Sequence, residues 1–169
     1  MNGEIVIRAA TPSDAAALVE LGRAVGSEPD GWLLSTSEWR GAGAERRYLR
    51  SLRRFEHAGV FVAEAPDGVV ARLSVARDPH PASPHVADLG LMVAATHRRL
   101  GLGRRLLEQA ADWARGAGVR KLELHVFPHN EPAIALYDRF GFRREGYRHE
   151  HYQRAGRYID AILMAYDVR

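Results

Sequence analysis

Apolar residues recur along this chain with two different spacings, and the spacings predict its secondary structure. Runs that are continuously apolar or apolar at every second position are typical of strands, and spacing by three and four is typical of amphipathic helices. Strands are predicted at residues 4–8, 60–63, 69–75, 86–94, 121–127, 142–147 and 158–168. Helices are predicted from Thr11 to Val25, over 44–57, from Leu102 to Gly116 or Gly118, and from Asn130 to Gly141.

The order of these elements, β-α-α-β-β-β-α-β-α-β-β, predicts an α/β protein with a central mixed sheet flanked by helices. The two strand–helix units that follow residue 86 are expected to supply the parallel part of the sheet through right-handed crossovers. The chain has 169 residues and contains neither an internal repeat nor a low-complexity tract. We therefore expect one domain over residues 1–169, with enough chain to bury a core.

The composition fits a soluble globular protein. Hydrophobic residues make up 46% of the chain and charged residues 27%. No apolar run approaches the ~20 residues of a membrane span, and residues 1–8 lack the apolar centre of a signal peptide. The absence of cysteine excludes disulfides, a thiolate metal site and a catalytic thiol. These features predict a cytoplasmic protein without a membrane partner.

The charge balance favours a small polyanion over a nucleic acid as ligand. The net charge is only +3, and the arginine pairs are interspersed with acidic residues instead of forming one basic stripe with aromatic residues. We therefore expect no nucleic-acid partner.

The most informative segment is the loop between residues 93 and 105, where a strand turns through Arg98-Arg-Leu-Gly101-Leu-Gly103 into a helix. Such a turn directs several backbone N–H groups toward one point, with the positive end of the helix dipole behind them, which suits a diphosphate. A P-loop would require Gly-Lys-Ser/Thr, and a dinucleotide fingerprint would require a small residue where Leu106 stands. On its own, the loop is equally compatible with an ordinary glycine turn.

In combination with the segments around it, this loop carries a family resemblance. The segments are Asp88-Leu-Gly-Leu-Met-Val93, Arg98-x-x-Gly101-x-Gly103, Asn130-Glu-Pro-Ala-Ile-Ala-Leu-Tyr137 and Phe140-Gly141-Phe142. In this order and spacing they resemble the GCN5-related N-acetyltransferase (GNAT) family over nearly the full length, most strongly over residues 86–165. Glu145-Gly146-Tyr147 and Gly156-Arg157-Tyr158-Ile159-Asp160 are similar to a bacterial branch that acts on amino acids and related small amines, with phosphinothricin-type detoxifying enzymes among its members.

The resemblance implies acetyl-CoA as co-substrate and assigns the residues that bind it. Backbone groups of Leu91, Met92 and Val93 would pair with the pantetheine arm like an added strand, and the amide of Val93 or Met92 would polarise the thioester carbonyl. Asn130 would bind the pantetheine, and the Tyr137 hydroxyl would lie at the sulfur. Backbone N–H groups of the loop would hold the pyrophosphate, which adds to the binding set Arg98, Arg99, Leu100, Gly101, Leu102, Gly103 and Arg104.

The residues alone also allow simpler interpretations of two of these positions. Asn130 fits a helix N-cap, and Tyr137 fits a tyrosine at the edge of the core. The two are seven residues apart, about two helical turns, and so lie on the same helix face. This paired spacing favours the functional interpretation of both.

The expected chemistry is direct attack of a primary amine on the acetyl thioester, which needs no nucleophilic residue. The amine, with an unperturbed pKa near ~10, must first lose a proton, and the departing thiolate must gain one, for which Tyr137 is the candidate donor. Asp88 is the first candidate for the base because it opens the predicted cofactor strand. Glu123, His125 and a chain of water molecules are the alternatives.

Two further residue pairs are less diagnostic. His149 and His151 alternate as a metal pair would, but two alternating histidines alone are usually exposed, so no metal is expected. Trp32 and Trp39 lie in segment 26–43, which in the resembling family helps to wall the acceptor site. They fit an apolar acceptor pocket and equally fit packing against the core or a dimer partner.

Together these inferences predict an acetyl-CoA-dependent N-acetyltransferase that acts on the primary amine of a small acceptor, an amino acid or amino-acid-like compound. One alternative is acetylation of protein N-termini or of an antibiotic amine. Another is a CoA-binding module without activity, against which the presence of Asn130 and Tyr137 counts. A homodimer through the last strands is common in the resembling family.

Overall fold

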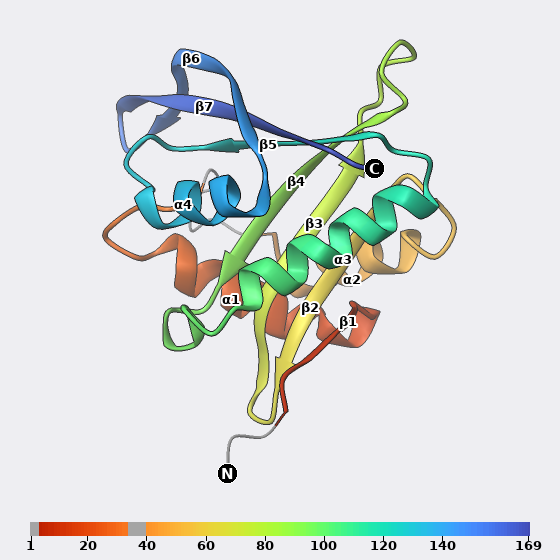
Figure 1. Ribbon diagram of the computed structural model, residues 1–169. Helices are drawn as coiled ribbons and strands as arrows, with labels where there is room; N and C mark the ends of the chain where they lie inside the picture. The colour runs from red at the N-terminus through yellow and green to blue at the C-terminus, as the bar shows by residue number, and fades with distance from the viewer. Residues whose placement is uncertain (1–3, 34–39) are drawn as a thin grey trace.

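A seven-stranded mixed sheet forms the centre of the molecule in the computed structural model, which describes residues 4–33 and 40–169 (Figure 1). The strand order is β1-β2-β3-β4-β5-β7-β6. Within the described residues, the pair β4/β5 is parallel and the other neighbouring pairs are antiparallel. The strands are β1 (Val6–Ala9), β2 (Ala58–Ala65), β3 (Gly68–Arg77), β4 (Val86–Val93), β5 (Lys121–Val126), β6 (Arg143–Arg154) and β7 (Arg157–Asp167).

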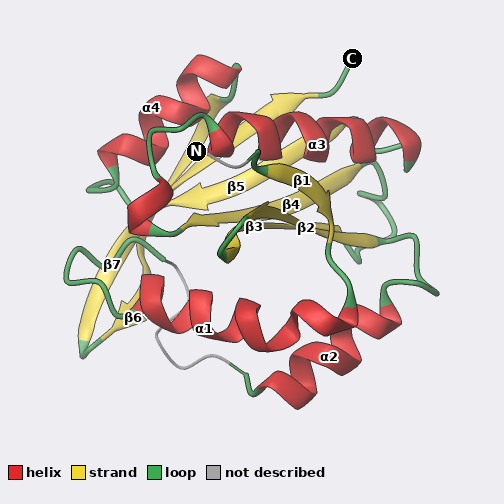
Figure 2. Ribbon diagram, turned by 90° about the horizontal axis from the view of Figure 1, so that it is seen from below, coloured by secondary structure: helices red, strands yellow, loops and turns green. Residues whose placement is uncertain are grey.

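Helices cover both faces of the sheet. Figure 2 shows α1 (Ala15–Gly26) and α2 (Ala42–Ser51) on one face and α3 (Leu102–Gly116) and α4 (Glu131–Phe140) on the other. The predicted order of strands and helices is confirmed, with two short 3-10 turns added at Pro12–Asp14 and Ala95–His97. In the described part of the chain, no helix has the length and apolar character needed to cross a membrane.

The parallel part of the sheet is smaller than the sequence predicts. Two strand–helix units were expected to contribute to it, but β7 lies between β5 and β6, so β6 pairs with β7 and not with β5. The predicted strand 142–147 is also too short, because β6 continues to Arg154 through almost entirely exposed residues. An exposed strand held by backbone pairing to one neighbour carries no alternation of apolar residues, and a pattern search therefore misses its second half.

The main core lies between the sheet and α3. Leu102, Leu106 and Leu107 are almost fully buried on α3 and pack against the apolar faces of the central strands. A smaller cluster lies on the other face, where Leu18 of α1 and Leu49 of α2 are buried. The helices are thereby fixed on both sides of β4 and β5, the strands between which the candidate site lies.

Candidate functional site

The strands β4 and β5 pair at one end and separate at the other. Their parallel register covers only Val86↔Lys121, Ala87↔Leu122 and Asp88↔Glu123. Beyond Asp88, β4 keeps β3 as its partner as far as Val93, whereas β5 has β7. The last residues of β4 therefore present a backbone edge to a gap inside the sheet.

The register of β3 and β4 decides which backbone groups face this gap. Asp78 N donates to Val86 O and Ala94 N donates to Val70 O. Because hydrogen bonds in an antiparallel pair involve every second residue, the residues between them with even numbers face β3. Leu91 and Val93 consequently direct their backbone groups into the gap, and Met92 directs its own toward β3. Of the two amides considered for the thioester carbonyl, the one that faces the gap is that of Val93.

The glycine loop lies at the open end of β4, where it leads into α3. Gly101 has φ of +78°, a left-handed conformation that favours glycine, and it caps α3. The first backbone bond of the helix is donated by Arg105 N to Gly101 O, at 3.2 Å. The N–H groups of Leu102, Gly103 and Arg104 precede it and have no intrahelical acceptor, as expected of a first helical turn. These are donors suited to an anion.

Gly103 has a second role, which is to let α3 approach α4. A Cβ atom at Gly103 would lie 2.6 Å from Cδ2 of Leu136, a residue of α4. The close approach brings the start of α3, which carries the loop, against the helix that carries Tyr137.

Three arginine side chains around the loop, Arg98, Arg104 and Arg105, are engaged with protein atoms. Arg98 forms a bidentate ion pair with Glu28, at 2.7 and 2.8 Å, and its Nε donates to Val93 O at 3.0 Å. Arg104 pairs with Glu108, and Arg105 donates to Ile5 O. The positive charge is therefore present at the loop, but Arg98 is held by a carboxylate 70 positions away that sequence reasoning did not identify.

Asn130 and Tyr137 both have the structural roles that the sequence allowed. Asn130 is the N-cap of α4, and its Oδ1 accepts from Ala133 N at 3.3 Å. Tyr137 is buried against Phe142, with ring centroids 5.6 Å apart. Burial raises the pKa of Tyr137, so its hydroxyl stays protonated at neutral pH. The cap leaves the Asn130 NH₂ group free of that bond, and protonation is the state that a proton donor requires.

The polar candidates for the base lie on the face of the sheet that α1 covers, opposite the face covered by α3 and α4. Side chains alternate along a strand, and Leu89 belongs to the core under α3, so Asp88 points toward the α1 face. Asp88 and Glu123 are register partners. Loss of hydration among the surrounding atoms raises the pKa of Asp88 to about 6, and repulsion from Glu123 adds to the effect. His125 lies two residues further along β5 on the same face as Glu123.

The strand β6 adds two residues that sequence reasoning missed, Tyr152 and Arg148, and a new setting for His151. Tyr152 lies 2.6 Å from His125, measured from its hydroxyl to Nδ1, and His151 packs edge-on against both rings. Loss of hydration is the larger cause of both pKa shifts: it raises the pKa of Asp88 and lowers the pKa of His125. The positive charge of Arg148 lowers the pKa of each residue by a smaller amount. The histidine, tyrosine and arginine residues of 147–152 were an available signal, but the predicted strand ended at residue 147 and left most of them outside it.

The segment after α1 also borders this face. Trp32 stacks on His129, which stacks in turn on the buried Phe127 at the end of β5. Phe127 contacts Tyr152. The polar cluster on this face consists of Asp88, Glu123, His125, Arg148 and Tyr152. Trp32 lies at its edge, and Trp39 lies outside the described residues.

The two histidines considered as a metal pair point to different partners. His149 lies 3.2 Å from Asp160, Nδ1 to Oδ1, whereas His151 belongs to the aromatic contacts of His125.

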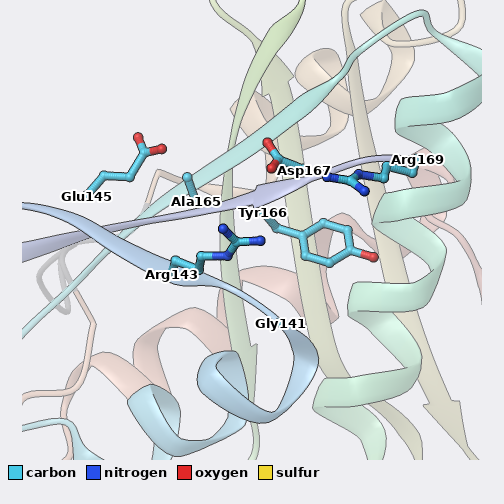
Figure 3. Close-up of a pocket in the computed structure, with 7 residues that line it drawn as sticks. All are labelled: Gly141, Arg143, Glu145, Ala165, Tyr166, Asp167 and Arg169. Atoms are coloured by element: carbon cyan, nitrogen blue, oxygen red, sulfur yellow. The ribbon is translucent and has the colours of Figure 1, made fainter.

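A separate cavity of about 200 Å³ opens between the start of β6 and the end of β7 (Figure 3). Its lining includes Arg143, Tyr166 and Arg169. Because Asp167 pairs with Lys121 at the beginning of β5, this cavity lies at the opposite end of β5 from the gap.

Known acetyltransferases are similar to this chain in sequence and in fold. The model of the acetyltransferase (GNAT) family matches residues 30–142. The chain is 35% identical over 109 residues to an L-amino acid N-acetyltransferase, AaaT, of Escherichia coli (strain K12), a match that covers 62% of this chain and 65% of that protein. It is 44% identical over 68 residues to the [ribosomal protein bS18]-alanine N-acetyltransferase of Salmonella typhimurium (strain LT2), with 40% and 46% covered.

The matches to these two curated relatives thus span between 46% and 65% of their lengths. Similarity to solved structures extends over more of the chain. The crystal structure of an acetyltransferase of the GNAT family from Streptococcus pneumoniae superposes with a TM-score of 0.89 at 27% identity, covering 98% of this chain and 100% of that one.

Proposed function

Because the chain belongs to the GNAT acetyltransferase family, we propose that it transfers the acetyl group of acetyl-CoA to the primary amine of a small acceptor. The observation that carries the proposal is the gap between β4 and β5, whose backbone edge leads to the start of α3, where N–H groups without an intrahelical acceptor suit an anion. We propose further that residues 1–169 act as one domain in the cytoplasm.

The residues around the gap fit acetyl-CoA in three respects. The backbone edge of β4 offers hydrogen bonds from Leu91 to the amides of a pantetheine arm, as a strand would, and the Val93 N–H faces the same gap, whereas Val93 O is bound by Arg98. The N–H groups at the start of α3 suit a diphosphate. Gly103 keeps the start of α3 close to α4, which carries Asn130 at its cap and Tyr137 further along.

The reaction proposed is direct transfer. A bond forms between the acceptor nitrogen and the acetyl carbon, the carbon–sulfur bond breaks, one proton leaves the nitrogen, and one proton reaches the sulfur. The Val93 N–H donates to the carbonyl oxygen as negative charge develops on it. Tyr137 supplies the proton to the sulfur, and Asp88 removes the proton from the amine, either directly or through water.

The acceptor we propose is an amino acid or an amino-acid-like compound. The positive charge of Arg148 is close enough to Asp88 to lower the pKa of that carboxyl group. Asp88 and Arg148 would therefore match the ammonium and the carboxylate of a zwitterion. The amino-acid acetyltransferase AaaT supports the same acceptor class.

A protein N-terminus is the second candidate acceptor. It is favoured by the similarity to the alanine N-acetyltransferase of a ribosomal protein. A peptide lacks a free α-carboxylate beside its amine, so Arg148 would have no such partner there.

The test is release of free CoA thiol from acetyl-CoA over panels of L-amino acids, polyamines, aminoglycosides and peptides. The chain contains no cysteine, so a thiol reagent detects the product without background from the protein. We expect turnover with amino acids, and with the corresponding amino-acid amides at a higher KM. Turnover confined to peptides would favour the second candidate, and tight binding of acetyl-CoA without turnover of any acceptor would favour a binding module.

A dimer through the last strands stays a prediction. The exposed side chains of Tyr147 and Tyr158 on β6 and β7 are the surface on which it would form.

A further inference from the structure

We propose that Glu28 is a positioning residue that couples the occupancy of the glycine loop to the wall of the acceptor site. The coupling runs through the guanidinium group of Arg98, whose two terminal nitrogens bind Glu28 and whose Nε binds the last residue of β4. This inference rests on the proposed function, since it concerns the response of the same site to CoA.

The guanidinium group of Arg98 joins the glycine loop to Glu28 and to β4. Its two terminal nitrogens donate to the two carboxylate oxygens of Glu28, and its Nε donates to Val93 O. The side chains of Arg98 and Glu28 are 35% and 19% exposed, so the pair is screened less than a surface ion pair. A bidentate guanidinium–carboxylate pair fixes direction as well as distance. A displacement of the loop backbone at Arg98 is therefore transmitted to Glu28.

The segment that begins with Glu28, residues 28–33, is attached to two further parts of the protein. Asp30 O accepts from His129 at 2.9 Å, and Gly31 O and Leu33 O accept from Arg154 of β6. The segment is thus joined to the glycine loop, to the turn before Asn130 and to β6, and each of these borders the gap or the polar cluster.

The same segment contributes Trp32 to the face of the sheet on which the polar cluster lies. Trp32 stacks on His129, and the row of rings continues through Phe127 to Tyr152, which bonds His125. An ordered loop around a diphosphate holds Arg98 in place, Arg98 holds Glu28, and Glu28 orders the segment that carries Trp32. Binding that orders a neighbouring segment lowers the entropic cost for the next ligand, so CoA would favour acceptor binding and the acceptor would favour CoA binding by the same factor.

The experiment is hydrogen exchange of the peptide that covers residues 28–33, measured with and without a saturating concentration of CoA. In the wild-type chain, CoA slows exchange of this peptide by roughly fivefold or more. In Glu28→Gln, CoA still binds, as followed by calorimetry, but the slowing disappears. A purely structural role for Glu28 would speed exchange equally in both states and leave the difference made by CoA intact.

The matched control is Glu108→Gln. It removes the other arginine–glutamate pair of the loop region, Arg104–Glu108, which is exposed and does not touch the segment. Its CoA-dependent slowing should equal that of the wild type. If Glu28→Gln does not fold, Glu28→Asp keeps the charge but shortens the reach by one methylene, and the same loss of slowing is expected.

Two results overturn the proposal. One is CoA-dependent slowing in the Glu28 variants that equals the wild type, and the other is a wild-type chain that binds CoA without any change in exchange at 28–33. A wild-type chain that binds no CoA at all would instead contradict the proposed function, so the two failures are distinguishable.

Discussion

At the scale of single residues, the environment of Tyr137 matches the role of a proton donor. Burial raises its pKa, so the hydroxyl remains protonated over the working pH range. We predict that Tyr137→Phe lowers kcat by roughly 10²-fold or more, while the Kd of acetyl-CoA changes little because the ring and its packing on Phe142 remain. Steady-state kinetics and calorimetry check the two halves of this prediction, and an unchanged kcat would remove Tyr137 from the mechanism.

The pKa of Asp88 predicts the pH dependence of the reaction. A base must be deprotonated, and the carboxyl group of Asp88 has a raised pKa of about 6. The acidic limb of kcat/KM in the wild type should therefore rise with pH through about 6. We predict that Asp88→Asn lowers the rate and abolishes this limb.

The control for Asp88 is Glu123→Gln, which removes the register partner's charge without removing the proposed base. Loss of that repulsion lets Asp88 ionise more readily, so the limb should move to lower pH and persist. A limb in Asp88→Asn that coincides with the wild-type limb would assign the base to another group, and the first to examine would be His125.

The sequence predicted the site unevenly at this scale. The turn into α3 could be predicted, because the spacing of Gly101 and Gly103 specifies it locally. The partner of Arg98 was not, because Glu28 is brought to it only by tertiary packing of α1 against β4. The same applies to Tyr152 at His125, a contact between strands separated by α4 in the chain.

At the scale of elements, α2 is attached to the sheet by a buried ion pair. Glu45 of α2 is 1% exposed and lies 3.2 Å from Arg72 of β3, whose side chain is 10% exposed. We predict that Glu45→Gln destabilises the chain by about 3 kcal/mol, because removing one member of a buried pair leaves the other charge without that compensation. Urea unfolding followed by circular dichroism measures this.

The comparison for Glu45 is the exposed pair Arg104–Glu108. Glu108→Gln should cost less than about 1 kcal/mol because solvent screens both charges. Equal costs for the two variants would show that the pair between α2 and β3 contributes no more than a surface pair.

The extent of each element follows the same division between local and tertiary causes. Amphipathic α3 was predicted to the residue at its start, since Gly101 and the apolar stripe specify it locally. The end of α2 was predicted at residue 57 and lies at Ser51. The next strand, β2, begins at Ala58, two residues before the apolar run 60–63 from which it was predicted. The length of β6 depends on its pairing with β7, which no local pattern encodes.

At the scale of the whole molecule, acetyl-CoA should act as a missing part of the fold by bridging β4 and α3. A ligand that binds only the native state at 100 times its Kd stabilises it by about 2.7 kcal/mol. For a chain of this size we predict a rise in Tm of about 5–10 °C, measured by differential scanning fluorimetry.

Pantetheine and ADP separate the two halves of this effect, since one lacks the diphosphate and the other lacks the arm. Each alone at the same concentration should raise Tm less than CoA does, and the ADP shift should shrink as salt is added. A full shift with pantetheine alone would contradict an anion-binding role for the loop.

The place of β7 inside the sheet sets the order in which the molecule can be completed during synthesis. Each of the strands β2 to β5 finds a partner in the strand made just before it, but β6 emerges before β7, its sheet neighbour. A nascent chain that has passed β6 therefore carries open strand edges on both β5 and β6, which favour intermolecular pairing. The arginines of β6, at positions 143, 144, 148 and 154, repel a second copy during this interval. In a released chain that ends at Gly156, residues 143–154 should be open to protease, and protection there would contradict this order.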